Sequence, residues 1–337
     1  MTQTALIVGG SGQIGRATAE RLLGAGWSIR LAQRRGARLP ETLRRRVEIV
    51  ALDRDAPGAL AKALAGGVDA LIDTVAYDET HAAQLLALEA DVGALVVISS
   101  GNVCRDDQGR TLDEAAQTGF PRFPVPITED QPTTEPGAAT YSTRKVALEQ
   151  TLLQRARRPT TILRPFAIHG PGSTHPREWW FVKRILDGRR RIPLAYNGES
   201  RFQTSATVNI AELIRVVLQA PATQVLNAAD SEAPSVADIG RAIADVYGAQ
   251  PELVLLDGAP ERGVGATPWS GPLPLVADMS RAEALGYRPA ATYREAIGGA
   301  CRSAEALAAA GVAFAPYLAK MFDYAAEDAR LAAGRSA

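Results

Sequence analysis

The sequence predicts a protein of the α/β class, built on a doubly wound parallel sheet with a smaller α/β lobe in its C-terminal half. Two observations predict this fold class. Short apolar, β-branched runs alternate with Ala- and Leu-rich segments in the first half, which is typical of βαβ units. The 337 residues, 46% hydrophobic and 22% charged, are the composition of a globular protein and enough for about two domains of roughly 150 residues.

Six runs in the first half are expected to be strands of the parallel sheet. They are Ala5–Val8, Ser28–Leu31, Val47–Ala51, Ala70–Asp73, Leu95–Ser99 and Thr161–Leu163. Gly, Ser, Asp and Thr residues at the strand ends place small and polar groups at the carboxyl edge of the sheet. Because open α/β sheets bind their ligands at that edge, we expect a site there.

The residue composition between and after these strands predicts helices and loops. Helices are expected at Arg16–Leu23, Val208–Leu218, Val236–Tyr247 and Arg281–Leu285. Residues 105–139 are rich in Pro and Gly, which predicts a loop-rich insertion on the surface near the carboxyl edge. Residues 301–333 are Ala-rich and are expected to form two terminal helices, broken near Gly311 and Pro316.

Charge and composition exclude several classes of function. Lys plus Arg and Asp plus Glu number 37 each, which argues against a nucleic-acid-binding protein. Apolar stretches stop well before the ~20 residues of a membrane span, and residues 1–10 lack the features of a secretory signal. We therefore expect a cytoplasmic protein without a membrane partner. Two cysteines and three histidines without ligand spacing predict no metal site.

A glycine-rich turn follows the first predicted strand and leads into a helix. Gly9, Gly12 and Gly15 have the spacing G-x-x-G-x-x-G. Glycines allow a tight turn and a close approach of the backbone to a pyrophosphate, whose charge the helix start favours. The strand–turn–helix context predicts a Rossmann-type dinucleotide site; a plain glycine turn is the alternative. The predicted phosphate-binding residues are Gly9, Ser11, Gly12, Gln13, Ile14 and Gly15.

This motif sets the expected domain organisation. Residues 1–172 are expected to form the dinucleotide-binding Rossmann domain, with 205–230 returning to it. Residues 173–204 and 231–300 are expected to form a substrate-binding lobe, and 301–337 a helical C-terminal extension.

The ends of the next strands carry further cofactor candidates. The second strand is followed by Arg34 and Arg35 and has no acid to receive a ribose 2′-hydroxyl. Because arginine accommodates a 2′-phosphate, we expect NADP(H) to be favoured over NAD(H); a solvated basic turn is the alternative. Asp53 is expected to accept an adenine amino hydrogen, unless it only caps a helix. Thr74, Val75 and Ala76 are expected to line the adenosine.

A tyrosine and a lysine stand four residues apart at the start of a helical segment. Tyr141 and Lys145 therefore lie on one helix face. An ammonium near a phenol favours phenolate, which predicts that Lys145 lowers the pKa of Tyr141 so that it can transfer a proton. Ser99 and Ser100 end the preceding strand and bring hydroxyls to the same edge.

Taken together, the chain resembles the extended short-chain dehydrogenase/reductase family, the NAD(P)-dependent epimerase/dehydratase group. The resemblance covers residues 4 to about 300. The motifs that carry it are the glycine turn, the run 99–103, Tyr141-x-x-x-Lys145, the runs 163–166 and 170–172, and the segments 225–239 and 278–289.

The resemblance implies roles for several residues. It implies that Tyr141 transfers the proton, that Lys145 lowers the pKa of Tyr141 and holds the nicotinamide ribose, and that Ser100 hydrogen-bonds the reacting oxygen. Pro165 and Ile168 would flank the nicotinamide. The substrate would be a small molecule, and a homodimer through helices beside the Tyr141 segment is possible.

The chain departs from relatives at substrate positions. Gly101 and Asn102 replace the Asp-Glu pair of sugar-nucleotide 4,6-dehydratases, which argues against that elimination and leaves Asn102 as a substrate contact. Ala167 replaces the asparagine of many epimerases. Trp179, Trp180 and Arg201 are further substrate candidates, with core packing and a surface ion pair as alternatives.

Three hypotheses for the function remain at this point. The first is an NAD(P)-dependent oxidoreductase that acts on a carbonyl or a secondary alcohol. The second is an NAD(P)-dependent nucleotide-sugar epimerase. The third is a regulator that binds dinucleotide without chemistry, against which Ser100, Tyr141 and Lys145 argue.

Overall fold

The computed structural model describes residues 2–36 and 39–333 of the chain. These residues form two compact units. Unit 1 takes its residues from 1–166, 207–229 and 277–290, and unit 2 takes its residues from 167–206, 230–276 and 291–337. Neither unit is a single stretch of sequence, because the chain passes between them repeatedly.

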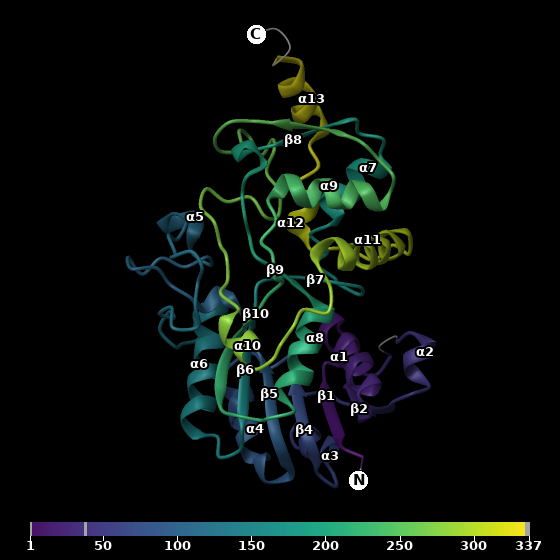
Figure 1. Ribbon diagram of the computed structural model, residues 1–337, viewed down its shortest axis with the longest axis vertical. Coiled ribbons are helices and arrows are strands. Elements are labelled where there is room, and N and C mark those ends of the chain that lie inside the picture. Colours follow the sequence, from purple (N-terminus) through teal and green to yellow (C-terminus); the bar gives the residue numbers. More distant parts are fainter. Residues whose placement is uncertain (1, 37–38, 334–337) are drawn as a thin grey trace. The chain divides into compact units, whose positions relative to one another are not determined.

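Unit 1 is built on a seven-stranded parallel sheet (Figure 1). Its strands are β1 (Thr4–Val8), β2 (Ser28–Gln33), β3 (Glu48–Ala51), β4 (Val68–Asp73), β5 (Val92–Ile98), β6 (Thr160–Pro165) and β10 (Gln224–Ala228). The order β10-β6-β5-β4-β1-β2-β3 grows outward in both directions from β1 and β4. This confirms the predicted doubly wound sheet, and it places the expected ligand crevice at the carboxyl ends of the strands beside that reversal.

Helices cover both faces of this sheet, because a crossover must link each pair of parallel strands. The helices of unit 1 are α1 (Gln13–Gly24), α2 (Glu41–Arg44), α3 (Ala59–Ala63), α4 (Glu79–Ala87), α5 (Ala115–Thr118), α6 (Tyr141–Arg155), α8 (Thr207–Val217) and α10 (Ser280–Ala284). The predicted helices that begin near residues 16, 208 and 281 are thus present. Within residues 105–139 the structure has the short α5 and otherwise irregular backbone, as the Pro and Gly content predicts.

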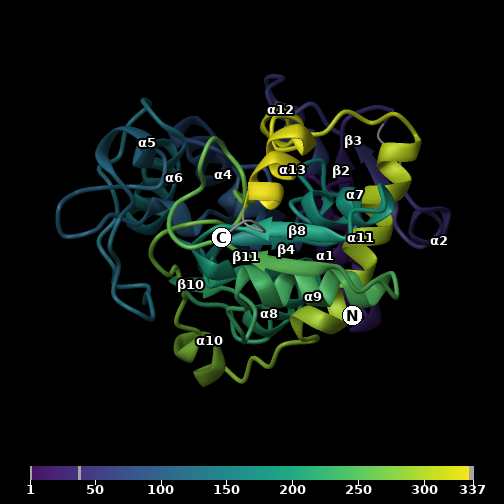
Figure 2. The same cartoon turned by 90° about the horizontal axis from the view of Figure 1, so that it is seen from above.

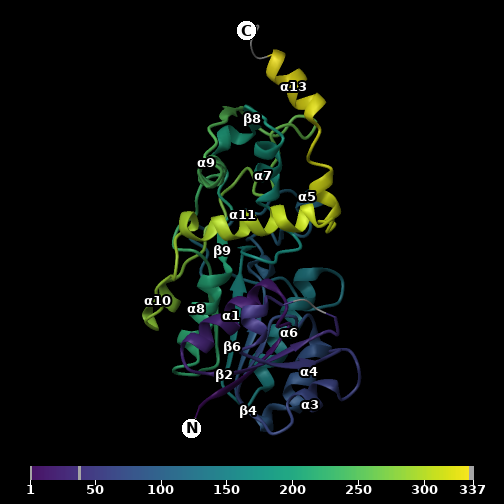
Figure 3. The ribbon, with the colours of Figure 1, turned by 90° about the vertical axis from the view of Figure 1, so that its right-hand side faces the viewer.

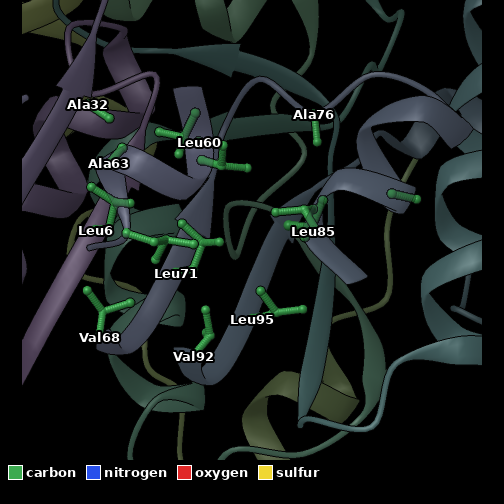
Figure 4. Close-up of a cluster of buried hydrophobic side chains, with 14 of the residues drawn as sticks. Leu6, Ala32, Leu60, Ala63, Val68, Leu71, Ala76, Leu85, Val92 and Leu95 are labelled. Atoms are coloured by element: carbon green, nitrogen blue, oxygen red, sulfur yellow. The ribbon is translucent and has the colours of Figure 1, made fainter. Parts of the chain in front are cut away.

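The core on one face of the sheet lies under α3, α4 and α6. In Figure 4, Leu6, Leu71 and Leu95 from neighbouring strands lie beside Leu60 of α3 and Leu85 of α4. These side chains have almost no exposed surface. Burial of apolar area stabilises the fold by about 25 cal/mol per Å². On the other face α1 packs against α8, so the strands are apolar on both sides, as the short continuous runs indicated.

Unit 2 has two pairs of short parallel strands and a helical core. Its strands are β7 (Ala167–His169), β8 (Arg191–Leu194), β9 (Thr204–Ala206) and β11 (Glu252–Leu255), and its helices are α7 (Trp179–Leu186), α9 (Val236–Val246), α11 (Tyr293–Ala309), α12 (Pro316–Ala319) and α13 (Tyr324–Ala333). β8 pairs with β11 (Figure 2). β7 pairs with β9. Trp180, Phe181 and Trp269 lie in the core with apolar residues of α9.

The C-terminal residues up to 333 are part of unit 2. α11, the long helix in Figure 3, begins at Tyr293 rather than near 301, because Thr292 and Glu295 form a capping box there. Further on, the Glu327 carboxylate of α13 pairs with the buried guanidinium of Arg184. That guanidinium lies 3.5 Å from the ring centroid of Trp180. The predicted extension 301–337 is therefore packed on the unit as far as it is described, and residues 334–337 lie outside the described residues.

Residues 277–290 belong to unit 1, although the sequence places them in the C-terminal lobe. The side-chain amide of Asn227 donates to the carbonyl of Asp278 at 3.1 Å, and Asn209 Oδ1 accepts from the N–H of Ala290 at 2.8 Å. These partners are far apart in sequence, so no local pattern marks them. The first boundary between the units, after Phe166, also precedes the predicted residue 172.

Candidate active site

The turn between β1 and α1 has the form of a phosphate cradle. The N–H groups of Gly9 and Gly10 both donate to the carbonyl of Ala32 at 3.1 Å, and Gly12 N–H donates to Gly9 O at 2.9 Å. Gly12 is the N-cap of α1, and no side chain caps the helix. The first N–H groups of the helix are therefore available to an anion, which the helix N-terminus favours. The predicted residues of this turn are Gly9, Ser11, Gly12, Gln13, Ile14 and Gly15, and all lie on it or in the first turn of α1.

Two of these glycines are required by the geometry of the turn. Gly9 has a φ of +83°, which side chains rarely adopt. A Cβ atom on Gly15 would lie 2.5 Å from Gly9 O and 2.8 Å from the Cα atom of Gly10. The helix therefore packs directly on the backbone of the turn. The residues present fit a dinucleotide pyrophosphate, since a side chain at either glycine would distort the cradle.

The ends of β2 and β3 present the residues predicted to bind the ribose and the adenine. Arg34 and Arg35 follow β2, and both are exposed. Asp53 follows β3 and is exposed, and its Oδ1 accepts from the N–H of Asp55 at 3.3 Å. Asp53 therefore shapes its own turn. The helix-capping alternative is not found, because the next helix, α3, has Gly58 as its N-cap and no side-chain cap. Two exposed cations beside β2 are compatible with a 2′-phosphate.

A buried ion pair at the end of β4 was missed by sequence reasoning. Asp73, the last residue of β4, is fully buried, and Arg54 Nη1 donates to its Oδ2. Asp73 Oδ1 accepts from the N–H groups of Val75 at 3.0 Å and Ala76 at 2.7 Å. The predicted adenosine-lining segment Thr74–Ala76 is thus held in a tight turn by the Asp73 carboxylate.

The end of β5 and the start of α6 bring together the three predicted catalytic residues. Ser100 follows β5, and Tyr141 and Lys145 lie in the first turns of α6, which begins with a capping box at Thr140. Lys145 Nζ lies 5.8 Å from the centroid of the Tyr141 ring, and the Ser100 hydroxyl lies near enough to the Tyr141 phenol to lower its pKa. Tyr141 is 38% exposed, whereas Ser100 and Lys145 are buried. Tyr141 is thus the most exposed of the three residues.

The Lys145 ammonium is held by two backbone carbonyls. Nζ donates to Ala76 O at 2.6 Å and to Ile98 O at 2.9 Å, at the ends of β4 and β5. An ammonium has three N–H groups, so one is left for a further acceptor such as a ribose hydroxyl. Burial lowers the pKa of Lys145 to about 8, against the opposing effect of the Asp73 carboxylate. Lys145 is therefore mainly a cation below about pH 8.

The pKa of Tyr141 differs from the sequence-based expectation. Burial raises the pKa of this phenol, the hydrogen bond with Ser100 lowers it, and the neighbouring Tyr77 raises it further. The predicted lowering by Lys145 is not found, because the ammonium donates to the two carbonyls rather than to the phenol. The rings of Tyr77 and Tyr141 lie 5.7 Å apart. Sequence reasoning missed Tyr77, since nothing in its local pattern distinguishes it.

Part of the 105–139 insertion holds the start of α6. Asp113 Oδ2 accepts from the N–H of Ser142 at 2.8 Å, and Ser142 Oγ donates to the carbonyl of Asn102 at 2.9 Å. The N–H of Asn102 in turn donates to Ser100 Oγ at 3.1 Å. The predicted substrate residue Asn102 therefore links the Ser100 turn to the helix that carries Tyr141. Its role in substrate binding stays a prediction.

The 163–166 motif has a structural role at the end of β6. Arg164 donates from Nη2 and Nε to the two carboxylate oxygens of Glu149 at 2.6 and 3.1 Å, and both side chains are buried. If Gly101 had a Cβ atom, that atom would lie 2.5 Å from the ring of Phe166, so the ring packs directly on this glycine. The predicted nicotinamide neighbour Pro165 ends β6, and Ile168 lies in β7 of unit 2.

The predicted substrate residues of unit 2 have different surroundings. Trp180 has no exposed surface and packs on Phe181 and Arg184, so in this structure it is a core residue. Trp179 packs edge-on against Phe314. Arg201 is exposed and lines a pocket of about 680 Å³. Trp179 and Arg201 stay candidates for substrate binding.

The next features are the side chains that could bind a metal ion and the buried thiol of Cys104. Among residues 2–36 and 39–333, no three His, Cys, Asp or Glu side chains are grouped to hold a metal ion. Burial raises the pKa of Cys104 to about 11, so this thiol is unreactive near neutral pH. None of the described helices has the length and apolarity to cross a membrane.

The chain is similar to known proteins in its sequence and in its fold. Residues 5–229 match the NAD dependent epimerase/dehydratase family. No functionally curated protein matches the sequence. Among solved structures, dTDP-glucose 4,6-dehydratase from Bacillus anthracis str. Ames in complex with NAD has a TM-score of 0.67 at 15% identity, over 90% of this chain and 97% of its own.

Two epimerase structures are similarly close. UDP-glucuronic acid 4-epimerase from Bacillus cereus, in complex with UDP-glucuronic acid and NAD, has a TM-score of 0.64 at 17% identity. UDP-glucose 4-epimerase from Thermotoga maritima, with UDP-glucose, has a TM-score of 0.64 at 16% identity. Each match covers 90% of this chain and 99% of the other. At these identities the likeness shows the fold alone.

Proposed function

Because this chain belongs to the NAD dependent epimerase/dehydratase family, we propose that it is an NAD(P)-dependent oxidoreductase that transfers hydride at a carbonyl or secondary alcohol. The observation that carries the proposal is the arrangement of Ser100, Tyr141 and Lys145 at the carboxyl edge of the sheet. The accessible phenol transfers the proton, and the Ser100 hydroxyl hydrogen-bonds the reacting oxygen. The third N–H of Lys145 binds the nicotinamide ribose.

The surroundings of the phenol support its use as a proton donor. Because burial raises the pKa of Tyr141, the hydroxyl is protonated at neutral pH and ready to protonate a carbonyl oxygen during reduction. In the reverse direction the phenolate accepts the alcohol proton. The bound nicotinamide supplies or accepts the hydride.

The cofactor assignment follows the sheet edge. The glycine turn would hold the pyrophosphate, Asp53 and the segment Thr74–Ala76 the adenosine, and Pro165 and Ile168 the nicotinamide end. Within this family we propose a preference for NADP(H), because Arg34 and Arg35 are exposed at the end of β2, where a 2′-phosphate would lie.

The Arg34→Ser/Arg35→Ser double variant is expected to weaken NADPH binding by roughly 10- to 100-fold, as charged hydrogen bonds are lost. NADH binding should change less than about twofold, since NADH has no 2′-phosphate. Titration calorimetry with both nucleotides measures this. The Arg44→Ser/Arg45→Ser variant is the matched control, because it removes two exposed arginines, the last residue of α2 and its C-cap. An equal loss for NADPH and NADH in the first variant would overturn the NADP preference.

A nucleotide-sugar epimerase is the second candidate. One observation favours it: exposed Arg201 lines the pocket of about 680 Å³ in unit 2, where it could pair with a substrate diphosphate. Residues 196 and 197 have positive φ values of 51° and 53° at the same pocket. The solved structures with UDP-sugars named above are of this class.

The amount of cofactor retained on purification separates the two candidates. An epimerase oxidises and re-reduces its substrate with one cofactor molecule, whereas a reductase exchanges its cofactor in each cycle. We expect the protein, purified without added nucleotide and then denatured, to release far less than one dinucleotide per chain. Chromatography with mass detection measures this. Release of close to one NAD(H) or NADP(H) per chain would instead establish the epimerase and direct assays to nucleotide sugars.

Two further expectations stay predictions from the sequence. One is a cytoplasmic location. The other is a homodimer formed through the helices beside the Tyr141–Lys145 segment. The proposed substrate remains a small molecule, and neither expectation enters the chemistry derived above.

A further inference from the structure

The buried pair of Arg54 and Asp73 has no part in the proton transfer described above. Arg54 is 8% exposed and Asp73 is 0% exposed. An unpaired carboxylate at this depth would be strongly unfavourable. Asp73 is stabilised by Arg54 on one oxygen and by the N–H groups of Val75 and Ala76 on the other. These three hydrogen bonds join the carboxylate to the loop after β3 and to the turn after β4.

The pair is connected to Lys145 through one carbonyl. Ala76 donates its N–H to the Asp73 carboxylate. The carbonyl oxygen of the same residue accepts a hydrogen bond from Lys145 Nζ at 2.6 Å. Ile98 O supplies the second acceptor at 2.9 Å. The direction of the third N–H of the ammonium therefore depends on where the turn after Asp73 places the Ala76 carbonyl.

The pair also acts on Lys145 by charge. Three charged groups act on the Lys145 ammonium: Asp73 at the end of β4, Arg54 in the loop after β3, and Glu149 on α6. The ammonium also lies 5.8 Å from the centroid of the Tyr141 ring. Asp73 and Glu149 stabilise the ammonium and Arg54 opposes it, while burial has the largest effect. Glu149 is itself bound to Arg164. Asp73 and Arg54 therefore act on Lys145 in opposite directions.

We propose that Arg54 and Asp73 are positioning residues for Lys145: Asp73 fixes the Ala76 carbonyl that orients the ammonium, and Arg54 holds the Asp73 carboxylate in its buried place. The importance of this pair for turnover rests on the proposed function of Lys145. Its effect on the lysine itself does not, and can be measured without cofactor or substrate.

The test is a direct titration of Lys145 in the intact, cofactor-free protein. The four lysines of the sequence are Lys62, Lys145, Lys183 and Lys320, so selective ¹³Cε-lysine labelling gives a simple NMR spectrum. The Lys145→Arg variant assigns the signal. In the native protein the midpoint is expected near pH 8, since the pKa of Lys145 is lowered to about 8.

Opposite shifts are expected for the two members of the pair. Asp73→Asn keeps an acceptor for the two backbone N–H groups but removes the negative charge, so the Lys145 midpoint should fall by roughly 1 pH unit. Arg54→Gln removes the opposing cation, so the midpoint should rise by a similar amount. Asp69→Asn is the matched control, because it removes the same charge from an exposed position on β4 and should leave the midpoint unchanged.

A variant that fails to fold does not leave the question open. The Arg54→Gln/Asp73→Asn double variant has no unpaired charge at this position, and its midpoint should lie between those of the two single variants. The double variant is therefore expected to titrate near the native midpoint. If the pair only packs, whichever single variant folds, Asp73→Asn or Arg54→Gln, will also titrate like the native protein, and that result would overturn the proposal.

A second readout tests the positioning of the turn. Asp73→Ala and Asp73→Asn remove the same charge, but only the alanine variant loses the acceptor for Val75 and Ala76. NADPH affinity, measured by fluorescence, should be about tenfold lower in Asp73→Ala than in Asp73→Asn. Equal affinities would contradict the orienting role of Asp73. Shifted Lys145 midpoints in a protein that binds no nicotinamide dinucleotide would instead contradict the proposed function and leave the Lys145–Asp73 coupling intact.

Discussion

Replacement of Tyr141 by phenylalanine is expected to reduce turnover by about 10²- to 10⁴-fold, the contribution of a general acid or base. Binding of nicotinamide dinucleotide should persist, because the ring and its contact with Tyr77 at 5.7 Å are retained. The change removes a single hydroxyl, whose pKa is lowered by the neighbouring Ser100. The Tyr141 residue is 38% exposed. Steady-state kinetics with a substrate from a ketone and aldehyde screen, together with fluorescence titration of NADPH, measures both quantities.

The neighbouring phenol provides the comparison for this experiment. Tyr77→Phe also removes one hydroxyl and leaves the paired rings in place. If Tyr77→Phe abolished turnover and Tyr141→Phe did not, the proton donor would be Tyr77. Undiminished turnover in Tyr141→Phe would falsify the proposed mechanism. A protein that binds dinucleotide normally and turns over no substrate, in native form as well as in both variants, would be the regulator considered from the sequence.

Replacement of Gly15 by alanine is expected to weaken dinucleotide binding by roughly 10- to 100-fold. The new Cβ atom would lie 2.5 Å from Gly9 O and 2.8 Å from the Cα atom of Gly10. Both are backbone atoms of a turn held by the carbonyl of Ala32, so the helix and the turn must separate. Overpacking of this kind costs about 1–3 kcal/mol, and each 1.4 kcal/mol is about tenfold in affinity. Calorimetric titration with NADPH and NADH measures the loss.

Gly24→Ala is the matched control in the same helix. No heavy atom lies within 4 Å of a Cβ atom at Gly24. Affinity should therefore be unchanged, and the melting temperature should rise slightly, since alanine favours a helix over glycine. Native affinity in a folded Gly15→Ala variant would show that the turn is not the cofactor site. A melting curve for each variant separates loss of binding from loss of folding.

The predicted site residues Tyr141 and Lys145 are close in sequence, whereas the pairs that the sequence did not predict join residues that are distant in sequence. Tyr141 and Lys145 are neighbours because helix geometry places residues four apart on one face. Arg54 and Asp73 are 19 positions apart. Arg54 follows β3 and Asp73 ends β4, and β1 and β2 lie between these two strands in the sheet, so the contact depends on the tertiary arrangement. No spacing rule joins such a pair. The same applies to Arg164 and Glu149, which join β6 to α6.

The pKa of Tyr141 shows the same distinction. A lysine one helical turn away predicts a lowered pKa, and that prediction was wrong in direction. The spacing of the two residues is local, but the ammonium donates to the carbonyls of Ala76, in the turn after β4, and of Ile98, the last residue of β5. Whether a nearby cation stabilises a phenolate depends on which groups it contacts, and those groups come from distant parts of the chain.

Local patterns were enough to predict the alternation of strands and helices, the glycine turn, and the placement of Ser100, Tyr141 and Lys145 at one edge of a parallel sheet. These features follow from local periodicity and from the rule that parallel strands end at the same edge. Four other features emerge from the folded chain: the return of residues 277–290 to unit 1, the burial of Trp180, the neighbourhood of Tyr77 and the Arg54–Asp73 pair. They could not be predicted, because contacts between distant segments depend on strand order and register, which local spacing does not encode.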